Sequence, residues 1–343
     1  SLDVNAKIHA GESGKVLWDN CIELTIETRK KFRDVAKHYI DNRTSEEEAW
    51  FFDPFVPDVV TIKNSPHIDD VVDEPWENIP TEVIKKEQQC WTMDPSSKWH
   101  GYEGYAEGYA MVDPNKLSLL TPGIDRNTGE YLDFGLPATV VANFLREHNI
   151  IPEKCDLNSI LFLMTPAEDE SKMNSLLANL VHFKELWDRD APMAEVLPSI
   201  AAAHAERYAG YTIRQVCNEM HQFYKKADIK SLQSKVFRAE HFPEPAMSPQ
   251  EASRALVGNE VDYLPLTDIK DRIAAMLALI YPPGIGVVLP GERWDKKAQP
   301  MLDYFLTFEE SFNLFPGFAY EVQGVFQEVV DGRIKFYTYV VQE

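Results

Sequence analysis

The glutamate–lysine pair at positions 153 and 154 is the first candidate for chemistry. Glu153 and Lys154 follow Pro152 in an extended stretch, and a proline there indicates a strand start or an edge strand. A carboxylate on a rigid strand can hold an ammonium group through charge-assisted hydrogen bonds. A glutamate beside an edge proline is more often a solvated surface residue. Residue type and spacing alone leave both interpretations open.

Two further polar residues are candidates for positions next to a site. His100 stands between Trp99 and Gly101, a setting in which a histidine more often packs or hydrogen bonds than acts as a base. Asp133 precedes a predicted helix, where its commoner role is to accept hydrogen bonds from backbone amides. Neither residue is therefore predicted to be catalytic.

Several familiar motifs are absent from the sequence. No HExxH occurs and the histidines are scattered, so no metal site is expected. No GxSxG occurs, which argues against a serine hydrolase. Gly284 and Gly286 in PPGIG match no phosphate-binding loop and predict a turn. The four cysteines have no CxxC spacing and predict reduced thiols, as in a cytoplasmic protein. They are Cys21, Cys90, Cys155 and Cys217.

Composition restricts the class of protein. The chain has 343 residues and a formal net charge of -21. A nucleic-acid or anionic-membrane partner is not expected, because such binding relies on clustered Lys and Arg. No apolar run approaches the length of a membrane span. The length exceeds that at which one core usually keeps growing, so two domains of a cytoplasmic protein are expected.

The candidate residues must be positioned by the stretch from Leu119 to Pro166. Pro137 predicts the first turn of a helix, and Asn149 predicts its left-handed end. Residues 150–154 are expected to run extended. Residues 159–164 form a nearly continuous apolar run, which predicts a strand buried on both faces.

Helices and strands alternate around this stretch. After a break at residues 11–14, apolar spacing predicts one long helix, and residues 166–190 predict a second. The order strand, helix, strand, helix predicts an α/β (α+β) fold with helices packed on a sheet. A domain boundary is expected at residues 189–192.

Local signals mark three other segments. The acidic stretch 64–87 contains prolines and predicts an exposed excursion. Ser248-Pro249-Gln250-Glu251 predicts a capping box. Asp331-Gly332 predicts the turn of a closing hairpin.

Separate motifs along the whole chain, in matching order, resemble the bacterial inducible ornithine/lysine/arginine decarboxylases. The resemblance implies a pyridoxal-phosphate-dependent enzyme of the aspartate-aminotransferase fold (fold type I). The wording DLNSILFLMTPAE and VQGVFQE most resembles the ornithine-specific members. The motifs are KWHGY (98–102), DPNK (113–116), TPGID (121–125), DFGLPA (133–138), the Glu153–Lys154 pair, ILFLMTP (160–166), YPPGIGVVLPGE (281–292) and FPGF (315–318).

The resemblance implies a lyase of polyamine biosynthesis that converts L-ornithine to putrescine and CO2. It assigns Glu153 to the distal ammonium of the diamino acid. In the family, the lysine that holds the cofactor as a Schiff base follows a histidine in a Ser-x-His-Lys motif. None of the nine histidines here is followed by lysine. The catalytic residues and most cofactor contacts are therefore expected upstream, and this chain is interpreted as the C-terminal portion of such an enzyme.

The resemblance also implies domains and partners. Residues 1–10 would end the large cofactor-binding domain, 11–190 would form the aminotransferase-like small domain, and 191–343 the family's C-terminal domain. The expected partners are the upstream large domain, an amino-acid substrate and a second copy, in a homodimer or higher homo-oligomer. Two alternatives stay open: a lysine or arginine decarboxylase of the same family, and a non-catalytic binding module. Alone, the chain is expected to self-associate through faces that normally pack on the large domain.

Overall fold

The computed structural model describes residues 1–66, 68–281 and 284–343. Helices and strands are mixed throughout, so the predicted α/β (α+β) class is confirmed. Within the described residues, no helix is both long and apolar enough to span a bilayer.

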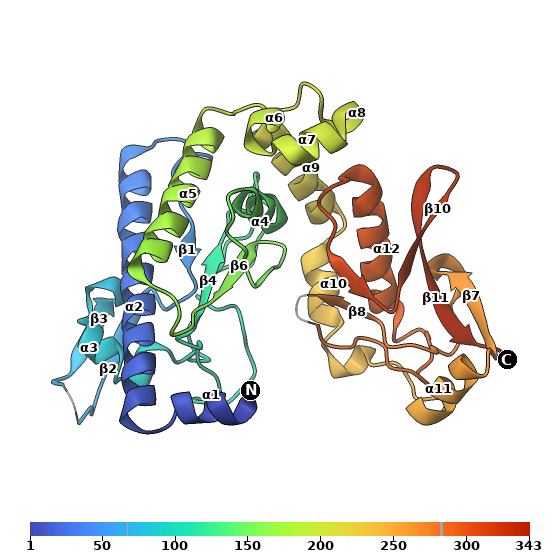
Figure 1. The fold of residues 1–343 in the computed structure, drawn as a ribbon, viewed down its shortest axis with the longest axis horizontal. Helices are drawn as coiled ribbons and strands as arrows, with labels where there is room; N and C mark the ends of the chain where they lie inside the picture. The colour runs from blue at the N-terminus through green and yellow to red at the C-terminus, as the bar shows by residue number, and fades with distance from the viewer. Residues whose placement is uncertain (67, 282–283) are drawn as a thin grey trace. The chain divides into compact units, whose positions relative to one another are not determined.

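The chain divides into two compact units (Figure 1). Unit 1 consists of residues 1–197 and 212–217, and unit 2 of residues 198–211 and 218–343. Helix α9 (Ile213–Lys226) contributes residues to both. The family-domain boundary at residues 189–192 stays a prediction.

Unit 1 is built on a four-stranded antiparallel sheet in the order β1-β4-β6-β5. Strands β4 and β6 pair along five residues, with Ser118 opposite Leu161. One face is apolar and buried, because alternate residues of both strands point into the core. The strands are β1 (Asp53–Pro54), β4 (Lys116–Leu120), β5 (Lys154–Cys155) and β6 (Ser159–Leu163). The buried residues of this face are Leu117, Leu119, Ile160 and Phe162.

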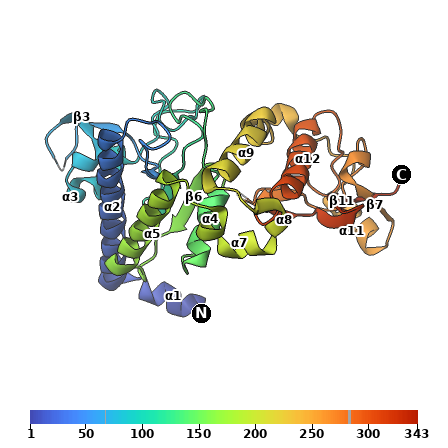
Figure 2. The ribbon, with the colours of Figure 1, turned by 90° about the horizontal axis from the view of Figure 1, so that it is seen from above.

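Three helices build the core of unit 1 with this sheet: α2 (Gly11–Asn42), α4 (Ala138–Glu147) and α5 (Glu170–Asp188). Helix α4 contacts β5 and β6, and α2 contacts β1. Helices α2 and α5 lie side by side in both views (Figures 1 and 2). Phe144 of α4 and Phe183 of α5 join in an edge-to-face ring contact, with centroids 5.2 Å apart, a geometry that aromatic pairs favour.

The prediction that residues 159–164 are buried on both faces is wrong. Burial alternates along β6: Ile160 and Phe162 are buried, whereas Leu163 is 48% exposed. The reason is that β6 pairs antiparallel with both neighbours, and sheets of this kind often pack only one face on the core.

Two predicted helix starts need correction. The break does not lie at residues 11–14, because α2 already begins at Gly11, after α1 (Leu2–Ile8). Gly14 is helical and permits a close approach of the two helices, since a Cβ there would overlap the carbonyl of His9. The second helix begins at Glu170 rather than at residue 166. Asp169 caps it by accepting a hydrogen bond from the Lys172 amide at 2.9 Å.

The ends of α4 are close to the predicted positions. Pro137 is the N-cap residue and not the first helical residue, with extended ψ of 128°. Asn149, just after the helix, has φ of 60°, so the predicted left-handed end is confirmed.

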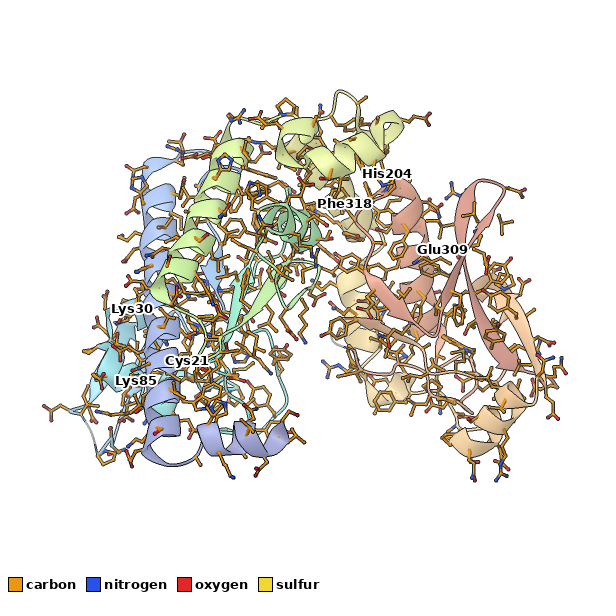
Figure 3. All side chains as sticks on the ribbon, in the orientation of Figure 1. Cys21, Lys30, Lys85, His204, Glu309 and Phe318 are labelled. Atoms are coloured by element: carbon orange, nitrogen blue, oxygen red, sulfur yellow. The ribbon has the colours of Figure 1, made fainter. Side chains whose placement is uncertain are left out.

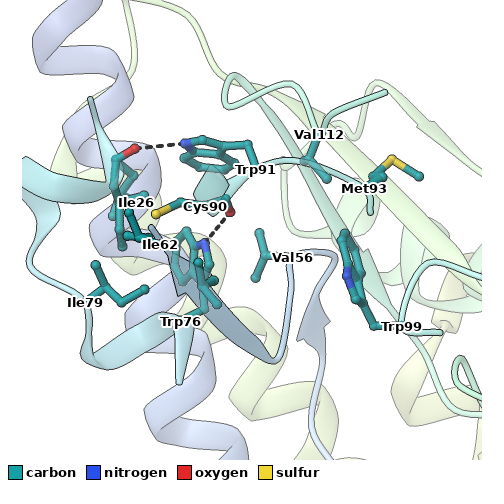
Figure 4. Close-up of a cluster of buried hydrophobic side chains, with 12 residues drawn as sticks. Ile26, Val56, Ile62, Trp76, Ile79, Cys90, Trp91, Met93, Trp99 and Val112 are labelled. Carbon is teal, nitrogen blue, oxygen red and sulfur yellow. Dashed lines mark hydrogen bonds between the residues drawn. The ribbon is translucent and has the colours of Figure 1, made fainter. Parts of the chain in front are cut away.

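The described residues of the stretch 64–87 pack around a second core of unit 1, so the stretch is not wholly an exposed excursion; residue 67 lies outside the described residues. It contains β3 (Val71–Pro75) and α3 (Thr81–Ile84), and β3 pairs with β2 (Val59–Ile62). Trp76 is fully buried, and its indole Nε1 donates to the Cys90 carbonyl at 2.9 Å (Figure 4). The buried tryptophan supplies the apolar area that holds this segment in place.

Helix α2 is tied to this second core by two lysines. The Lys30 ammonium donates to the Ile79 carbonyl at 2.6 Å, and Lys85 pairs with Glu23 at 3.1 Å (Figure 3). One long helix therefore serves as a common support for both parts of unit 1.

Unit 2 contains a three-stranded antiparallel sheet in the order β10-β11-β7. Helix α12 packs on it, and Glu309 of α12 accepts the Phe336 amide at 2.6 Å while pairing with Lys335 at 2.8 Å (Figure 3). A short sheet joins β8 and β9. The elements are α6 (Met193–Val196, in unit 1), α7 (Pro198–Ala203), α8 (Ala205–Tyr208), α10 (Ile229–Lys235), α11 (Pro249–Val257), α12 (Gln299–Leu314), β7 (Val261–Pro265), β8 (Leu279–Tyr281), β9 (Glu321–Gln323), β10 (Phe326–Val330) and β11 (Arg333–Val341).

Local sequence signals in unit 2 are confirmed. Ser248 and Glu251 exchange the two hydrogen bonds of a capping box at the start of α11. Asp331 and Gly332 both have positive φ, as the hairpin turn between β10 and β11 requires. In the PPGIG motif, residues 282 and 283 lie outside the described residues, while Gly284 has φ of 77°, which suits a turn.

Candidate functional site

Glu153 lies immediately before β5, an edge strand of the sheet in unit 1. Its backbone amide donates to the Leu161 carbonyl at 2.9 Å, which fixes its main chain against β6. Its side chain is exposed and forms no ion pair with a residue that the structure describes. The main chain of Glu153 is thus fixed at the edge of the sheet, and its carboxylate is open to a ligand.

His100 is a packed, hydrogen-bonding residue of a loop. Its side chain is 6% exposed. Nδ1 accepts from the Tyr102 amide at 3.0 Å, so in the neutral ring Nε2 carries the proton and donates to the Asp94 carbonyl at 2.7 Å. The Tyr105 hydroxyl lies 3.2 Å from Nε2 and donates to the Met93 carbonyl at 2.8 Å. His100 therefore fastens this loop at three points.

Asp133 lies four residues before Pro137, the N-cap residue of α4. Asp133 is exposed, in a segment held by the backbone bond from the Leu132 amide to the Gly123 carbonyl at 3.0 Å. The expectation that Asp133 accepts hydrogen bonds from backbone amides near the helix start stays a prediction. The hydrogen bonds of His100 lie within its own loop and the backbone amide of Glu153 bonds to β6, so these two candidates belong to different segments of unit 1.

The motifs TPGID, DFGLPA and DLNS meet around Asn158. Its amide nitrogen donates to the Pro122 carbonyl at 3.0 Å and the Leu136 carbonyl at 3.4 Å. Gly123 has φ of 145°, and a Cβ there would overlap the Asn158 side chain. A larger residue at Gly123 would therefore both strain the backbone and displace Asn158. These motifs join the start of α4 to the turn before β6.

The turn after TPGID is closed by Asp125. Its Oδ1 accepts hydrogen bonds from the Thr128 amide at 2.7 Å, the Thr128 hydroxyl at 2.9 Å and the Asn127 amide at 3.0 Å. The backbone hydrogen bond from Thr128 is the largest cause that holds the pKa of Asp125 below its ordinary value. The carboxylate thus has a structural role in this turn.

An ion-pair network that sequence reasoning missed lies beside the sheet. Arg126 and Arg33 share the carboxylates of Asp53 and Asp58. The Arg126–Asp53 distance is 2.9 Å, and Arg33 lies 3.1 Å from Asp53 and 3.0 Å from Asp58. Burial lowers the pKa of Arg126 from its ordinary value. Two cations and two anions balance one another, so this network is complete without a ligand.

A pocket of about 440 Å³ opens beside the partly exposed face of the sheet. Sequence reasoning missed it, although the tyrosines of GYEGYAEGYAM were the signal. Leu161, which anchors the backbone of Glu153, is among the lining residues. The lining, here called the tyrosine pocket, consists of Phe55, Met93, Tyr102, Tyr105, Tyr109, Ala110, Met111, Val112, Asp113, Lys116, Ser118 and Leu161.

Arg29 supports the DPNK motif at one side of this pocket. Its side chain is fully buried, and its guanidinium donates to the carbonyls of Pro114 and Lys116, each at 2.8 Å. It also lies 5.2 Å from the ring centroid of Trp91. Burial lowers its pKa to about 9. Burying a charge is costly unless it is hydrogen bonded, so the two carbonyl partners of Arg29 indicate that the backbone of residues 114–116 is tightly fixed.

A buried lysine of unit 1 is engaged in structural contacts and is not free to hold pyridoxal phosphate. The side chain of Lys184 is buried, and its ammonium donates to the Glu48 carbonyl at 2.8 Å and pairs with Asp188. Its ammonium also lies 4.6 Å from the ring centroid of Tyr39. These contacts give the Lys184 ammonium a structural role. No cluster of three or more His, Cys, Asp or Glu in the described part of the chain is arranged to hold a metal ion.

Family comparisons cover both units. A model of the Orn/Lys/Arg decarboxylase major domain matches residues 1–172, and one of the C-terminal domain matches residues 230–342. The inducible ornithine decarboxylase of Escherichia coli (strain K12) is 47% identical over 342 residues, which cover 100% of this chain and 43% of that protein. The lysine decarboxylase LdcA of Pseudomonas aeruginosa is 32% identical, with 95% and 39% covered.

A solved structure agrees with these matches. The structure of lysine decarboxylase A from Pseudomonas aeruginosa superimposes with a TM-score of 0.83 at 29% identity, covering 100% of this chain and 42% of that one. The chain spans less than half the length of the relatives it matches. The matches to both family domains show that the chain belongs to the Orn/Lys/Arg decarboxylase family.

Proposed function

We propose that the chain is the C-terminal part of a pyridoxal-phosphate-dependent decarboxylase that converts L-ornithine to putrescine and CO2. One observation carries the choice of substrate. The chain is 44–47% identical to four ornithine decarboxylases, and 29–32% identical to relatives named for lysine or arginine. Lysine and arginine are the alternative substrates.

Glu153 is proposed to bind the distal ammonium of the substrate. Its exposed carboxylate and its main chain fixed to β6 support this role. A carboxylate at a fixed position selects for chain length, because an ammonium one methylene too far or too near loses the hydrogen bond. Arginine would bring a broader, planar guanidinium to the same place.

The cofactor is proposed to be held by the upstream part of the full enzyme. When bound, it supplies the electron sink that decarboxylation needs. The upstream part would then hold the cofactor, and the present chain would form the part of the site that contacts the substrate. The proposed domains are residues 1–10, 11–190 and 191–343, and the proposed assembly is a cytoplasmic homodimer or higher homo-oligomer.

The test is steady-state kinetics of the full-length enzyme with ornithine, lysine and arginine. We expect the highest kcat/KM with ornithine. Glu153→Gln should raise KM for ornithine roughly 10- to 100-fold, because a hydrogen bond between charged groups contributes about 1.5–3 kcal/mol. The absorbance of the bound cofactor should not change. Glu206→Gln, an exposed glutamate in unit 2, is the control and should leave KM unchanged.

The outcomes separate the alternatives. An unchanged KM in the Glu153→Gln enzyme would reject the binding role of Glu153 but not the reaction. A higher kcat/KM with lysine or arginine would reject ornithine as the substrate. No turnover of any of the three would favour the non-catalytic binding module.

A further inference from the structure

The tyrosine pocket of unit 1 has the features of a ligand site that the proposed function does not use. We propose that it binds a short alkylammonium compound, meaning a primary ammonium on an aliphatic chain of a few carbons. The pocket volume of about 440 Å³ lies within the range of small-molecule sites. The proposal rests on the geometry of the pocket and does not depend on the decarboxylase assignment.

The walls of the pocket suit an aliphatic chain. Phe55, Met93, Met111 and Leu161 present mainly carbon and sulfur atoms. Methionine side chains are flexible and polarisable and adapt to apolar ligands of different shape. This part of the lining therefore suits the aliphatic chain of a ligand and not its charged end, because it offers few polar partners to replace lost water.

The tyrosines supply the attraction for a cation. The hydroxyl of Tyr105 is occupied by the Met93 carbonyl and His100, which leaves its ring as the part available to a ligand. Tyr102 and Tyr109 are 59% and 80% exposed and lie beside it, with the Tyr105 and Tyr109 ring centroids 6.2 Å apart. Aromatic faces carry partial negative charge and attract ammonium groups within about 6 Å.

Asp113 supplies a full negative charge at the pocket. It accepts a hydrogen bond from the Asn115 amide at 2.9 Å and lies 3.8 Å from the Lys116 ammonium. Asp113 and Lys116 are each about half exposed, and loose surface pairs of this kind contribute little free energy. A ligand ammonium can therefore take the place of Lys116 at low cost. An anionic ligand would be repelled by the partial negative charge of the ring faces.

Buried polar groups hold both sides of the pocket in place. His100 fastens the segment that carries Tyr102 and Tyr105. Arg29 fastens the segment of Asp113 and Lys116 through two carbonyls. A site whose supports are buried and hydrogen bonded is preorganised for its ligand. This accounts for the KWHGY and DPNK motifs, which the proposed function leaves without a role.

The test is titration of the full 343-residue chain, without cofactor, with n-butylammonium, and with 1-butanol as the neutral probe of similar length. Binding is followed by NMR of fluorotyrosine-labelled protein. We expect saturable shifts of a subset of the tyrosine signals with n-butylammonium. 1-Butanol should bind about two- to fivefold more weakly, because a cation over an aromatic ring gains about 0.5–1 kcal/mol at an exposed site.

Matched variants locate the site. Tyr109→Leu keeps the apolar volume and removes the ring face, and Asp113→Asn removes the charge. Each should weaken n-butylammonium binding about two- to fivefold. Glu103→Gln makes the same change in net charge in the same loop, but Glu103 does not line the pocket, so its affinity should equal that of the parent chain.

Three results would overturn the proposal. One is equal affinity for n-butylammonium and 1-butanol, which would mean general apolar binding. Another is equal weakening by Glu103→Gln and Asp113→Asn, which would mean attraction by net charge alone. The third is the lack of saturable binding by a folded chain. Because no turnover is measured, none of these results bears on the reaction proposed above.

Discussion

The two faces of the β1-β4-β6-β5 sheet differ in what they contribute. The buried face carries Leu119 and Ile160 and packs into the core of unit 1. The partly exposed face carries Ser118 and Leu161, which line the tyrosine pocket. The buried face therefore contributes more to the stability of unit 1 than the other face does, since burial of apolar area is the main favourable term in folding. The other face is left to hold ligand-binding groups.

The largest expected effect is a loss of stability when the buried face of the sheet is changed. Leu119→Ala should destabilise the chain by about 2–5 kcal/mol, because it removes a buried side chain and leaves a cavity. Leu163→Ala makes the same chemical change on the paired strand, where the side chain is 48% exposed, and should change stability by only about 0.5 kcal/mol. Urea unfolding of both variants measures the difference. Equal losses would show that the second face is also a core face.

A smaller effect is expected from the loop that covers the exposed face. His100→Gln should cost about 1–3 kcal/mol, because buried partners of the ring lose their hydrogen bonds. Protection of the Tyr102 amide in hydrogen exchange should fall, while amides of β4 and β6 keep theirs. His182→Gln, on the surface of α5, is the control. Loss of protection throughout the sheet would mean that the loop belongs to the core and is not a separate cover of the pocket.

The smallest effect concerns pH and sharpens the same comparison at the turn after β4. The pKa of Asp125 is below its ordinary value because its carboxylate accepts hydrogen bonds from Thr128. A depressed pKa in the folded state means that Asp125 stabilises the chain above its unfolded pKa of about 3.9, and that this stabilisation is lost as pH falls through the folded pKa. Asp125→Asn should therefore lower stability at pH 7 by about 1 kcal/mol or less.

Unfolding free energies of the parent and Asp125→Asn chains should converge as pH falls below about 4. A difference that stays constant from pH 7 to pH 3 would assign the effect to hydrogen-bond geometry and not to charge. Asp34→Asn, at an exposed aspartate of α2, serves as the comparison variant.

Signals that act over a few residues were readable from the sequence. The capping box at Ser248 and Glu251, the positive φ at Asn149 and the Asp331-Gly332 hairpin turn all appear in the structure. Each depends on the steric or hydrogen-bonding properties of neighbouring residues, which the chain carries locally. The mixed helix and sheet class followed from periodicity in the same way.

The candidate site was only partly predictable. The exposure of Glu153 at an edge strand agrees with the pattern around Pro152. The packing of His100 followed from its apolar neighbours. The tyrosine pocket was not predictable, because its walls come from Phe55 just after β1, from β4 and β6, and from the loop between residues 93 and 113. No window of sequence contains these segments together.

Sequence by itself determined the local turns, the helix caps, the apolar stripes and the motifs of the Orn/Lys/Arg decarboxylase family. Tertiary structure decided which face of β6 is buried and that Trp76 lies in a core of unit 1. It also decided that Asn158 joins three motifs through its hydrogen bonds. The physical reason is the range of the interactions. Backbone sterics and capping act between neighbours in the chain, whereas burial and shared hydrogen bonds exist only once distant segments have met.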